Sequence, residues 1–199
     1  MDSEVIQAVK DCNTETLQAL LDRGATPEAQ DDKGLSALGL AALSGCHSVA
    51  VILLSQGASV ERGGSSHKFP LTIAAANNQL EMVKLLLAHG ADVNAYSDKS
   101  GLFCTPLIAA SLYGHTDVVS LLLGYGADIE KRCYRGQTAL FCWKPHVVRI
   151  LLKHGAKIDV KDNDGKTALT SALHELNHEE FYEGMQEVVN LLQEASRMH

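Results

Sequence analysis

The chain has 199 residues, of which 46% are hydrophobic and 5% aromatic, and its formal net charge at pH 7 is -7. A net negative charge argues against general nucleic-acid binding, because that activity needs a basic surface to neutralise phosphates. The longest uninterrupted apolar run, residues 49–54, is far too short to cross a bilayer, and the opening residues MDSEVIQAVKD lack the pattern of a secretion signal. We therefore expect no membrane partner and a location in the cytoplasm, with the nucleus as a second compartment.

Charge is distributed unevenly along the chain. Residues 130–166 contain 9 Lys and Arg against 4 Asp and Glu, whereas residues 1–60 contain 3 against 8 and residues 167–199 contain 1 against 6. The chain therefore begins and ends with acidic segments, and residues 130–166 form a basic band between them.

The five cysteines are an odd number and show no C-x-x-C spacing. This arrangement suggests neither a disulfide framework nor a zinc ribbon, and it fits a reducing compartment.

One phrase, Leu-Leu-x-x-Gly-Ala, occurs five times, as LLDRGA, LLSQGA, LLAHGA, LLGYGA and LLKHGA. Its glycines, at positions 24, 57, 90, 126 and 155, are 33, 33, 36 and 29 residues apart. A repeat of this length indicates a solenoid of small units that bury their apolar faces against one another. We expect a single domain.

The third unit shows what each repeat encodes. Pro70 suits the first turn of a helix, and the polar pair Asn77 and Asn78 predicts where that helix ends. A second helix is predicted from the apolar residues at helical spacing, which are Leu80, Val83, Leu86 and Leu87. Gly90 can take the left-handed conformation that ends it.

The segment CTPLIAASLYGHTDVVSLLLGYGADIE, residues 104–130, resembles the signature of the ankyrin repeat, and related blocks cover essentially the whole chain. The resemblance implies an all-α fold, an ankyrin-repeat α-solenoid of antiparallel helix pairs joined by projecting hairpin loops. Where the family usually has His after Thr-Pro-Leu, and ties neighbouring turns together by its hydrogen bonds, this chain has Gly39, Thr72, Ile108, Phe141 and Thr170.

The register divides residues 1–199 into six units. They are an N-terminal cap at 1–33, repeats at 34–66, 67–102 and 103–135, a short repeat at 136–164 and a C-terminal cap at 165–199.

The fifth unit departs from the pattern. Thr105 precedes Val118 by 13 residues in the fourth unit, but Thr138 precedes Val147 by only 9 in the fifth. We expect the inner helix to have lost about one turn, and Pro145 to keep it from being regular. The alternative interpretation is a deletion absorbed by local repacking.

The resemblance implies a protein-protein interaction module that binds a partner through a concave face of hairpin tips and inner helices. The chain would act as an adaptor or scaffold, or alternatively as an inhibitor covering the working surface of an enzyme such as a kinase. Mapped onto this sequence, the partner-binding positions are Asp32, Lys33, Leu35, Leu43, Ser66, Lys68, Asn77, Lys99, Phe103, Leu112, Tyr113, Tyr134, Arg135, Gln137, Trp143 and Lys144.

Aromatic and basic residues dominate the positions mapped to the fourth and fifth units, and these side chains often dominate interface energetics. They coincide with the basic band. We therefore expect a monomer that binds an acidic segment of another protein carrying one or two apolar anchors. The alternative interpretations are a solvated charged face without a partner, and an exposed Phe103 that folds back onto the neighbouring hairpin.

One motif points to an enzyme. His174, Glu175 and His178 form H-E-x-x-H, in which two His bind zinc and the Glu acts as base. Phe181 stands where the longer zinc motif has glycine, and no third ligand follows at a familiar spacing. A zinc metallopeptidase is thus a remote alternative to an acidic polar helix face, and we expect no enzyme, metal or cofactor.

A modification site is the last candidate. Asn94 follows Leu86 by eight residues in LLAHGADVNA, which resembles the pattern hydroxylated on ankyrin hairpins by an asparaginyl hydroxylase. The alternative is that Asn94 only closes its hairpin.

Overall fold

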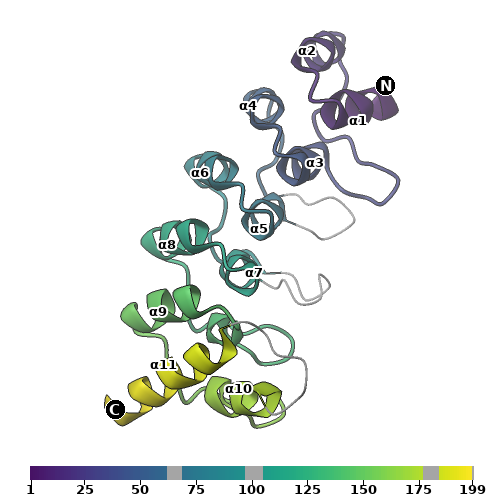
Figure 1. The fold of residues 1–199 in the computed structure, drawn as a ribbon. Coiled ribbons are helices and arrows are strands. Elements are labelled where there is room, and N and C mark those ends of the chain that lie inside the picture. Colours follow the sequence, from purple (N-terminus) through teal and green to yellow (C-terminus); the bar gives the residue numbers. More distant parts are fainter. Residues whose placement is uncertain (62–68, 97–104, 177–183, 199) are drawn as a thin grey trace.

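Stacked helix pairs make up the fold, as seen in a computed structural model that describes residues 1–61, 69–96, 105–176 and 184–198. Within these ranges the regular elements are all helical, and the pairs stand side by side in one curved row with the two termini at opposite ends (Figure 1). The expected all-α solenoid is confirmed.

Each pair contributes one helix to an inner row, from which the loops project, and one to an outer row (Figure 1). The inner row contains α1 (Asp2–Lys10), α3 (Ala37–Ser44), α5 (Pro70–Ala76), α7 (Pro106–Tyr113) and α10 (Ala168–Leu176). The outer row contains α2 (Thr14–Asp22), α4 (His47–Ser55), α6 (Leu80–Ala88), α8 (Thr116–Gly124), α9 (Pro145–Lys153) and α11 (Met185–Met198).

Local signals set where the inner helices begin and end. The Thr105 hydroxyl accepts a hydrogen bond from the backbone N–H of Ile108 (3.2 Å), and Pro106 follows at the first helical position. Helix α7 ends at Gly114, which has a φ of 81° and so adopts a conformation that disfavours side chains. Asn78 serves the same purpose after α5, with a φ of 56°, as its place in the sequence predicted.

The inner helices stack through small side chains. Ala41, Ala74, Ala75, Ala109 and Ala110 have no exposed surface, and α5 contacts both α3 and α7. Alanine has no side-chain bulk beyond Cβ, so the helix backbones can approach closely. Direct contact between neighbouring helices runs along the inner row from α1 to α7 and continues beyond it to the fifth pair.

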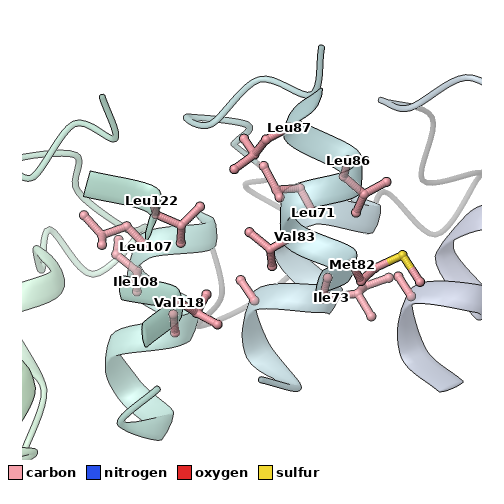
Figure 2. Close-up of a cluster of buried hydrophobic side chains, with 14 of the residues drawn as sticks. Leu71, Ile73, Met82, Val83, Leu86, Leu87, Leu107, Ile108, Val118 and Leu122 are labelled. Carbon is pink, nitrogen blue, oxygen red and sulfur yellow. The ribbon is translucent and has the colours of Figure 1, made fainter. Parts of the chain in front are cut away.

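The outer helices bury a broader stripe than the sequence suggested. Figure 2 shows Met82, Val83, Leu86 and Leu87 of α6 packed in the core with side chains of α5, α7 and α8. The predicted Leu80 is only half-buried, whereas Met82 is 2% exposed. An outer helix packs both on its own inner helix and on neighbouring outer helices, so its apolar face is wider than a single stripe.

A ladder of hydrogen bonds joins successive hairpins. In each rung, a side chain four residues after the repeated glycine accepts from a backbone N–H of the next repeat, two residues after that repeat's glycine. The rungs are Glu28 to Ser59 (2.6 Å), Glu61 to Asp92 (2.5 Å), Asn94 to Asp128 (2.7 Å) and Glu130 to Lys157 (2.8 Å).

The expectation that the cysteines form no disulfide is wrong for one pair. Cys12 and Cys46 are joined by a disulfide, with a Cα–Cα distance of 5.6 Å. Their separation of 34 residues is one repeat, so stacking brings the α1–α2 turn against the α3–α4 turn. Cys133 and Cys142 are free and buried.

The inner helix of the fifth pair is reduced to the 3-10 helix η2 (Ala139–Phe141). The expected shortening is confirmed and is larger than one turn. Pro145 does not interrupt this segment, contrary to expectation, because it occupies the first turn of α9, where its missing N–H costs nothing.

Replacing Glu61 with Ala removes one rung of the ladder and should lower the free energy of unfolding by about 1 kcal/mol, because the N–H of Asp92 loses its acceptor. Glu61→Gln keeps an acceptor oxygen and should recover most of the loss. Urea denaturation of the full chain measures both.

Asp159 is the matched control. It is exposed and occupies the equivalent position after Gly155, where no rung forms, so Asp159→Ala should change stability by less than about 0.5 kcal/mol. Equal effects of Glu61→Ala and Asp159→Ala would show that the ladder does not stabilise the stack.

Candidate protein-binding face

The turn patch is the name used here for Tyr113, Lys144 and Trp143, which lie at or next to the turn that follows α7. Tyr113 ends α7 and is 52% exposed, while Trp143 is half-buried against the core. The Lys144 side chain lies along Gly114, where an added Cβ would come within 3.3 Å of its Cγ and Cδ. Because Gly114 follows Tyr113 directly, the Lys144 side chain lies at the turn that carries Tyr113, and Trp143 is the residue before Lys144 in the chain.

Neighbouring side chains hold the Tyr113 ring in place. It stacks on His115, with ring centroids 5.8 Å apart and an interplanar angle of 22°. The Nε2 of His115 is 3.0 Å from the carbonyl oxygen of Ala76, at the end of α5. Tyr113 is thus supported by two helix pairs, which lowers the entropy that binding would cost.

A second cluster, the fingertip pair, lies on the hairpin before η2 and consists of Tyr134 and Arg135. The Arg135 guanidinium carbon lies 5.6 Å from the centroid of the Tyr134 ring, and its Nε donates to the Tyr134 hydroxyl (3.0 Å). Tyr134 is 46% exposed. Stacking on an aromatic face and donating to its hydroxyl orient the guanidinium.

The next hairpin fixes the backbone of the fingertip pair. The backbone N–H of Asn163 donates to the carbonyl of Arg135 (2.9 Å), and its side-chain Nδ2 donates to the carbonyl of Tyr134 (2.8 Å). The sequence analysis did not predict this role of Asn163. Asn163 occupies the same position in its hairpin as Tyr134 in the preceding hairpin, and this equivalence could have indicated that the two residues lie next to each other.

Two residues of this region serve the hairpins rather than a free surface. Arg132 donates through Nε to the carbonyl of Gly136 (2.7 Å) and through Nη2 to the carbonyl of Lys161 (2.6 Å). The predicted contact residue Gln137 donates to Asp162 Oδ2 (3.4 Å) and so bridges two hairpins.

Asp162 organises the last hairpin. It is 8% exposed, and its Oδ1 accepts from the backbone N–H groups of Asp164 (3.0 Å) and Lys166 (2.9 Å). Burial raises the pKa of this carboxyl, but the hydrogen bonds from Lys166, Gln137 and Asp164, with the Lys166 charge, outweigh burial and lower the pKa below its usual value.

Several cations of the basic band, residues 130–166, are not available on the inner face. Arg132 is used internally, and Arg149 pairs with Glu187 (2.7 Å) between α9 and α11 of the outer row. Lys131 lies 5.9 Å from the Tyr96 ring centroid. Arg135 lies beside the exposed Tyr134, and Lys144 lies at the turn that carries the exposed Tyr113.

The remaining predicted contact residues occupy varied environments. Asp32, Lys33 and Asn77 are exposed, Leu43 is 49% exposed at the end of α3, and Leu112 is half-buried. Leu35 is 8% exposed and belongs to the core, so its side chain is not part of the face. Ser66, Lys68, Lys99 and Phe103 lie outside the described residues.

The predicted residues do not form one cluster. Hairpin residues precede each inner helix and turn residues follow it, so the fingertip pair and the turn patch lie at opposite edges of the face. In the fifth pair only the short η2 separates these edges.

The H-E-x-x-H motif falls partly within the structure. His174 and Glu175 are exposed on α10, with Nδ1 and Oε1 3.6 Å apart, and His178 lies outside the described residues. Among the residues that the structure describes, no group of three or more His, Cys, Asp or Glu could hold a metal ion. Within the same residues, no helix is long and apolar enough to span a membrane.

Comparisons with known proteins agree with this architecture. The family model for ankyrin repeats matches residues 5–97 and 107–196. The mouse B-cell lymphoma 3 protein homolog is 43% identical over 93 residues, which cover 43% of this chain and 21% of that protein. A Caenorhabditis elegans homolog of the transient receptor potential channel subfamily A member 1 is 36% identical over 110 residues, covering 55% of this chain and 9% of that protein. The chain thus spans about a fifth or less of these relatives.

Two solved structures show the same fold over nearly the whole chain. The ankyrin repeat domain of Bcl-3 superposes with a TM-score of 0.77 at 27% identity, covering 95% of this chain and 81% of that one. An ankyrin repeat domain from Acinetobacter baumannii gives a TM-score of 0.80 at 27% identity, covering 96% and 97%.

Asp162→Asn should lower the free energy of unfolding at pH 7 by about 1 kcal/mol, because a neutral amide accepts weaker hydrogen bonds than a carboxylate. The folded pKa is lowered, so the carboxylate stabilises the fold above the unfolded pKa of about 3.9 and loses this effect as pH falls through the folded value. The difference from wild type should therefore stay constant from pH 7 to about pH 5 and shrink as the pH falls below the unfolded pKa of about 3.9. Urea denaturation at several pH values tests this, and a difference independent of pH would contradict it; Asp159→Asn is the exposed control.

Proposed function

The chain belongs to the ankyrin-repeat family, whose members serve typically as non-enzymatic protein-interaction modules, and we propose that it works as an adaptor or scaffold that holds a partner protein on its inner face. The observation that carries this proposal is the turn patch. Tyr113 is 52% exposed yet stacked on a histidine, Lys144 lies at the same turn, and the half-buried Trp143 precedes that lysine; these residue types are typical of an interface hot spot.

The patch suits an acidic partner segment with one or two apolar anchors. Tyr113 and Trp143 offer apolar area, and Lys144 offers a positive charge beside them. Arg135, oriented by Tyr134, can bind a carboxylate with two parallel hydrogen bonds at the hairpin edge. We propose that a monomer of this chain binds such a segment across the fourth and fifth helix pairs.

An inhibitor is the second candidate function. The Bcl-3 ankyrin domain that superposes on this chain belongs to the IkappaB protein family. An inner face could inhibit a partner enzyme by covering its working surface. Assays of a partner enzyme with and without this chain separate the two functions. Unchanged activity in the bound complex supports an adaptor, and loss of activity supports an inhibitor.

Tyr113→Ala and Trp143→Ala should each weaken partner binding by about 2 kcal/mol, a roughly 30-fold rise in Kd. The partner is captured from cell extract with the full wild-type chain, identified by mass spectrometry and titrated against each variant by calorimetry. Thermal melts report whether the variants fold, and Tyr113, being exposed, should tolerate alanine with little change in stability.

Tyr125 supplies the matched control for this experiment. It is 53% exposed at the end of α8, in the outer row, so Tyr125→Ala removes a similar ring from the opposite side and should leave the Kd unchanged. Equal affinity of wild type and the Tyr113→Ala, Trp143→Ala double variant would refute the turn patch as the binding site.

We also propose that Asn94 is a substrate of an asparaginyl hydroxylase. Its backbone is on the hairpin after α6, it is partly exposed, and its Oδ1 accepts from the N–H of Asp128. Incubation of the full chain with an active hydroxylase should add one oxygen to the peptide containing Asn94, detected by mass spectrometry. An unmodified peptide, with a known substrate modified in the same tube, contradicts the proposal; Asn94→Gln is the negative control.

A further inference from the structure

Cys12 and Cys46 occupy a distinctive place in the stack. Cys12 lies in the turn between α1 and α2 and is exposed, whereas Cys46 is the residue before α4 and is 6% exposed. Their Cα atoms are 5.6 Å apart, within the usual range for a disulfide. One sulfur of the bond is therefore carried by a surface turn.

The same contact recurs along the row without a covalent bond. In two further turns, the glycine with positive φ faces the residue that precedes the next outer helix. Gly45 faces Gln79, whose Nε2 would be 2.8 Å from an added Cβ, and Gly114 faces Lys144 at 3.3 Å. The disulfide thus joins the first turn to the second at a position where the other turns only touch.

The backbone at Cys12 is in the left-handed region, with a φ of 51°. The equivalent turns use Gly45, Asn78 and Gly114, residue types that adopt this conformation readily. A cysteine is a strained choice there, and backbone strain of this kind is concentrated at functional positions. Cys12 therefore occupies a backbone conformation that glycine would adopt at a lower free-energy cost.

The other described cysteines are unsuited to exchange. Cys142 has no exposed surface, and burial raises the pKa of its thiol to about 12, against the lowering effect of backbone hydrogen bonds and of the Lys144 charge. Cys133 is 6% exposed. A thiol reagent in solution would thus meet the pair at the N-terminal end before these two.

We propose that Cys12 and Cys46 form a reversible thiol–disulfide site for small thiols of the glutathione type, and that its oxidation fastens the α1–α2 pair to the α3–α4 pair. In reduction, a glutathione thiolate attacks the exposed Cys12 sulfur, the Cys12–Cys46 bond breaks, and Cys46 leaves as a thiolate that takes a proton. A second glutathione thiolate attacks the mixed disulfide and releases the Cys12 thiolate with oxidised glutathione. One disulfide is reduced while two glutathione molecules are oxidised; in the reverse reaction one oxidised glutathione is consumed and two reduced glutathione molecules are released.

The bond crosses the interface between the first two helix pairs. There α1 packs on α3, α2 packs on α4, and Glu28 accepts from the N–H of Ser59. Units of a solenoid can open one at a time, because each is held mainly by the interfaces with its neighbours. The disulfide adds a covalent tie between residues 34 positions apart across this interface.

The full chain is equilibrated in mixtures of reduced and oxidised glutathione, trapped by acid, and mapped by mass spectrometry without reduction. We expect the Cys12–Cys46 peptide pair in oxidised glutathione and its replacement by two thiols in excess reduced glutathione. Hydrogen exchange on the same samples should be at least about tenfold slower in residues 2–22 when the bond is present, and unchanged in residues 106–124.

Cys12→Ser and Cys46→Ser are the matched variants. In each, exchange in residues 2–22 should equal that of the reduced wild type whatever the glutathione mixture. Three results would overturn the proposal: no Cys12–Cys46 peptide in oxidised glutathione, a bond that persists in a large excess of reduced glutathione, or equal exchange of residues 2–22 in both states. Persistence of the bond would make it a permanent structural link.

Discussion

Each helix pair in this chain can bury its apolar surface only against its neighbours, and the rest of the structure depends on that constraint. The helices are mostly seven to nine residues long, too short to be stable in water alone. Alanines with no exposed surface let α3, α5 and α7 touch, and leucines and valines of the outer helices fill the space behind them. Stability is thus added interface by interface, and the exposed side of the inner row remains free to carry variable residues.

Neighbouring hairpins are joined by hydrogen bonds that were not predicted from the sequence. Non-His residues stand after the Thr-Pro-Leu positions, where the resemblance placed an inter-repeat tie. The ladder of Glu28, Glu61, Asn94 and Glu130 links the same hairpins through their backbone N–H groups instead. Asn94 is therefore both a structural rung and the proposed site of modification, so the two roles share one side chain.

The sequence was sufficient for the fold because the repeated Leu-Leu-x-x-Gly-Ala phrase encodes an outer helix and its end. It was less informative where contacts cross between repeats. The bond between Cys12 and Cys46 follows from their spacing of one repeat only once stacking is considered. The burial of Leu35 and of Met82 likewise depends on the neighbouring pair, which a pattern read within one unit does not contain. Tyr113, mapped from the sequence to the partner-binding face, is exposed, but its stacking on His115 could not be predicted from the sequence.

The replacement of an inner helix by η2 narrows the inner row where the last helix pair joins the stack. The inner helices touch in succession up to α7, and the short η2 continues the row by contacting α7 on one side and α10 on the other. The last pair is coupled to the others through η2, through the contact of α11 with α9, and through the hairpin bonds of Asn163. A ligand bound across η2 would add contacts to those that the polypeptide already makes there. Its binding would then be thermodynamically linked to the folding of the C-terminal pair, so that recognition strengthens the stack where it is narrowest.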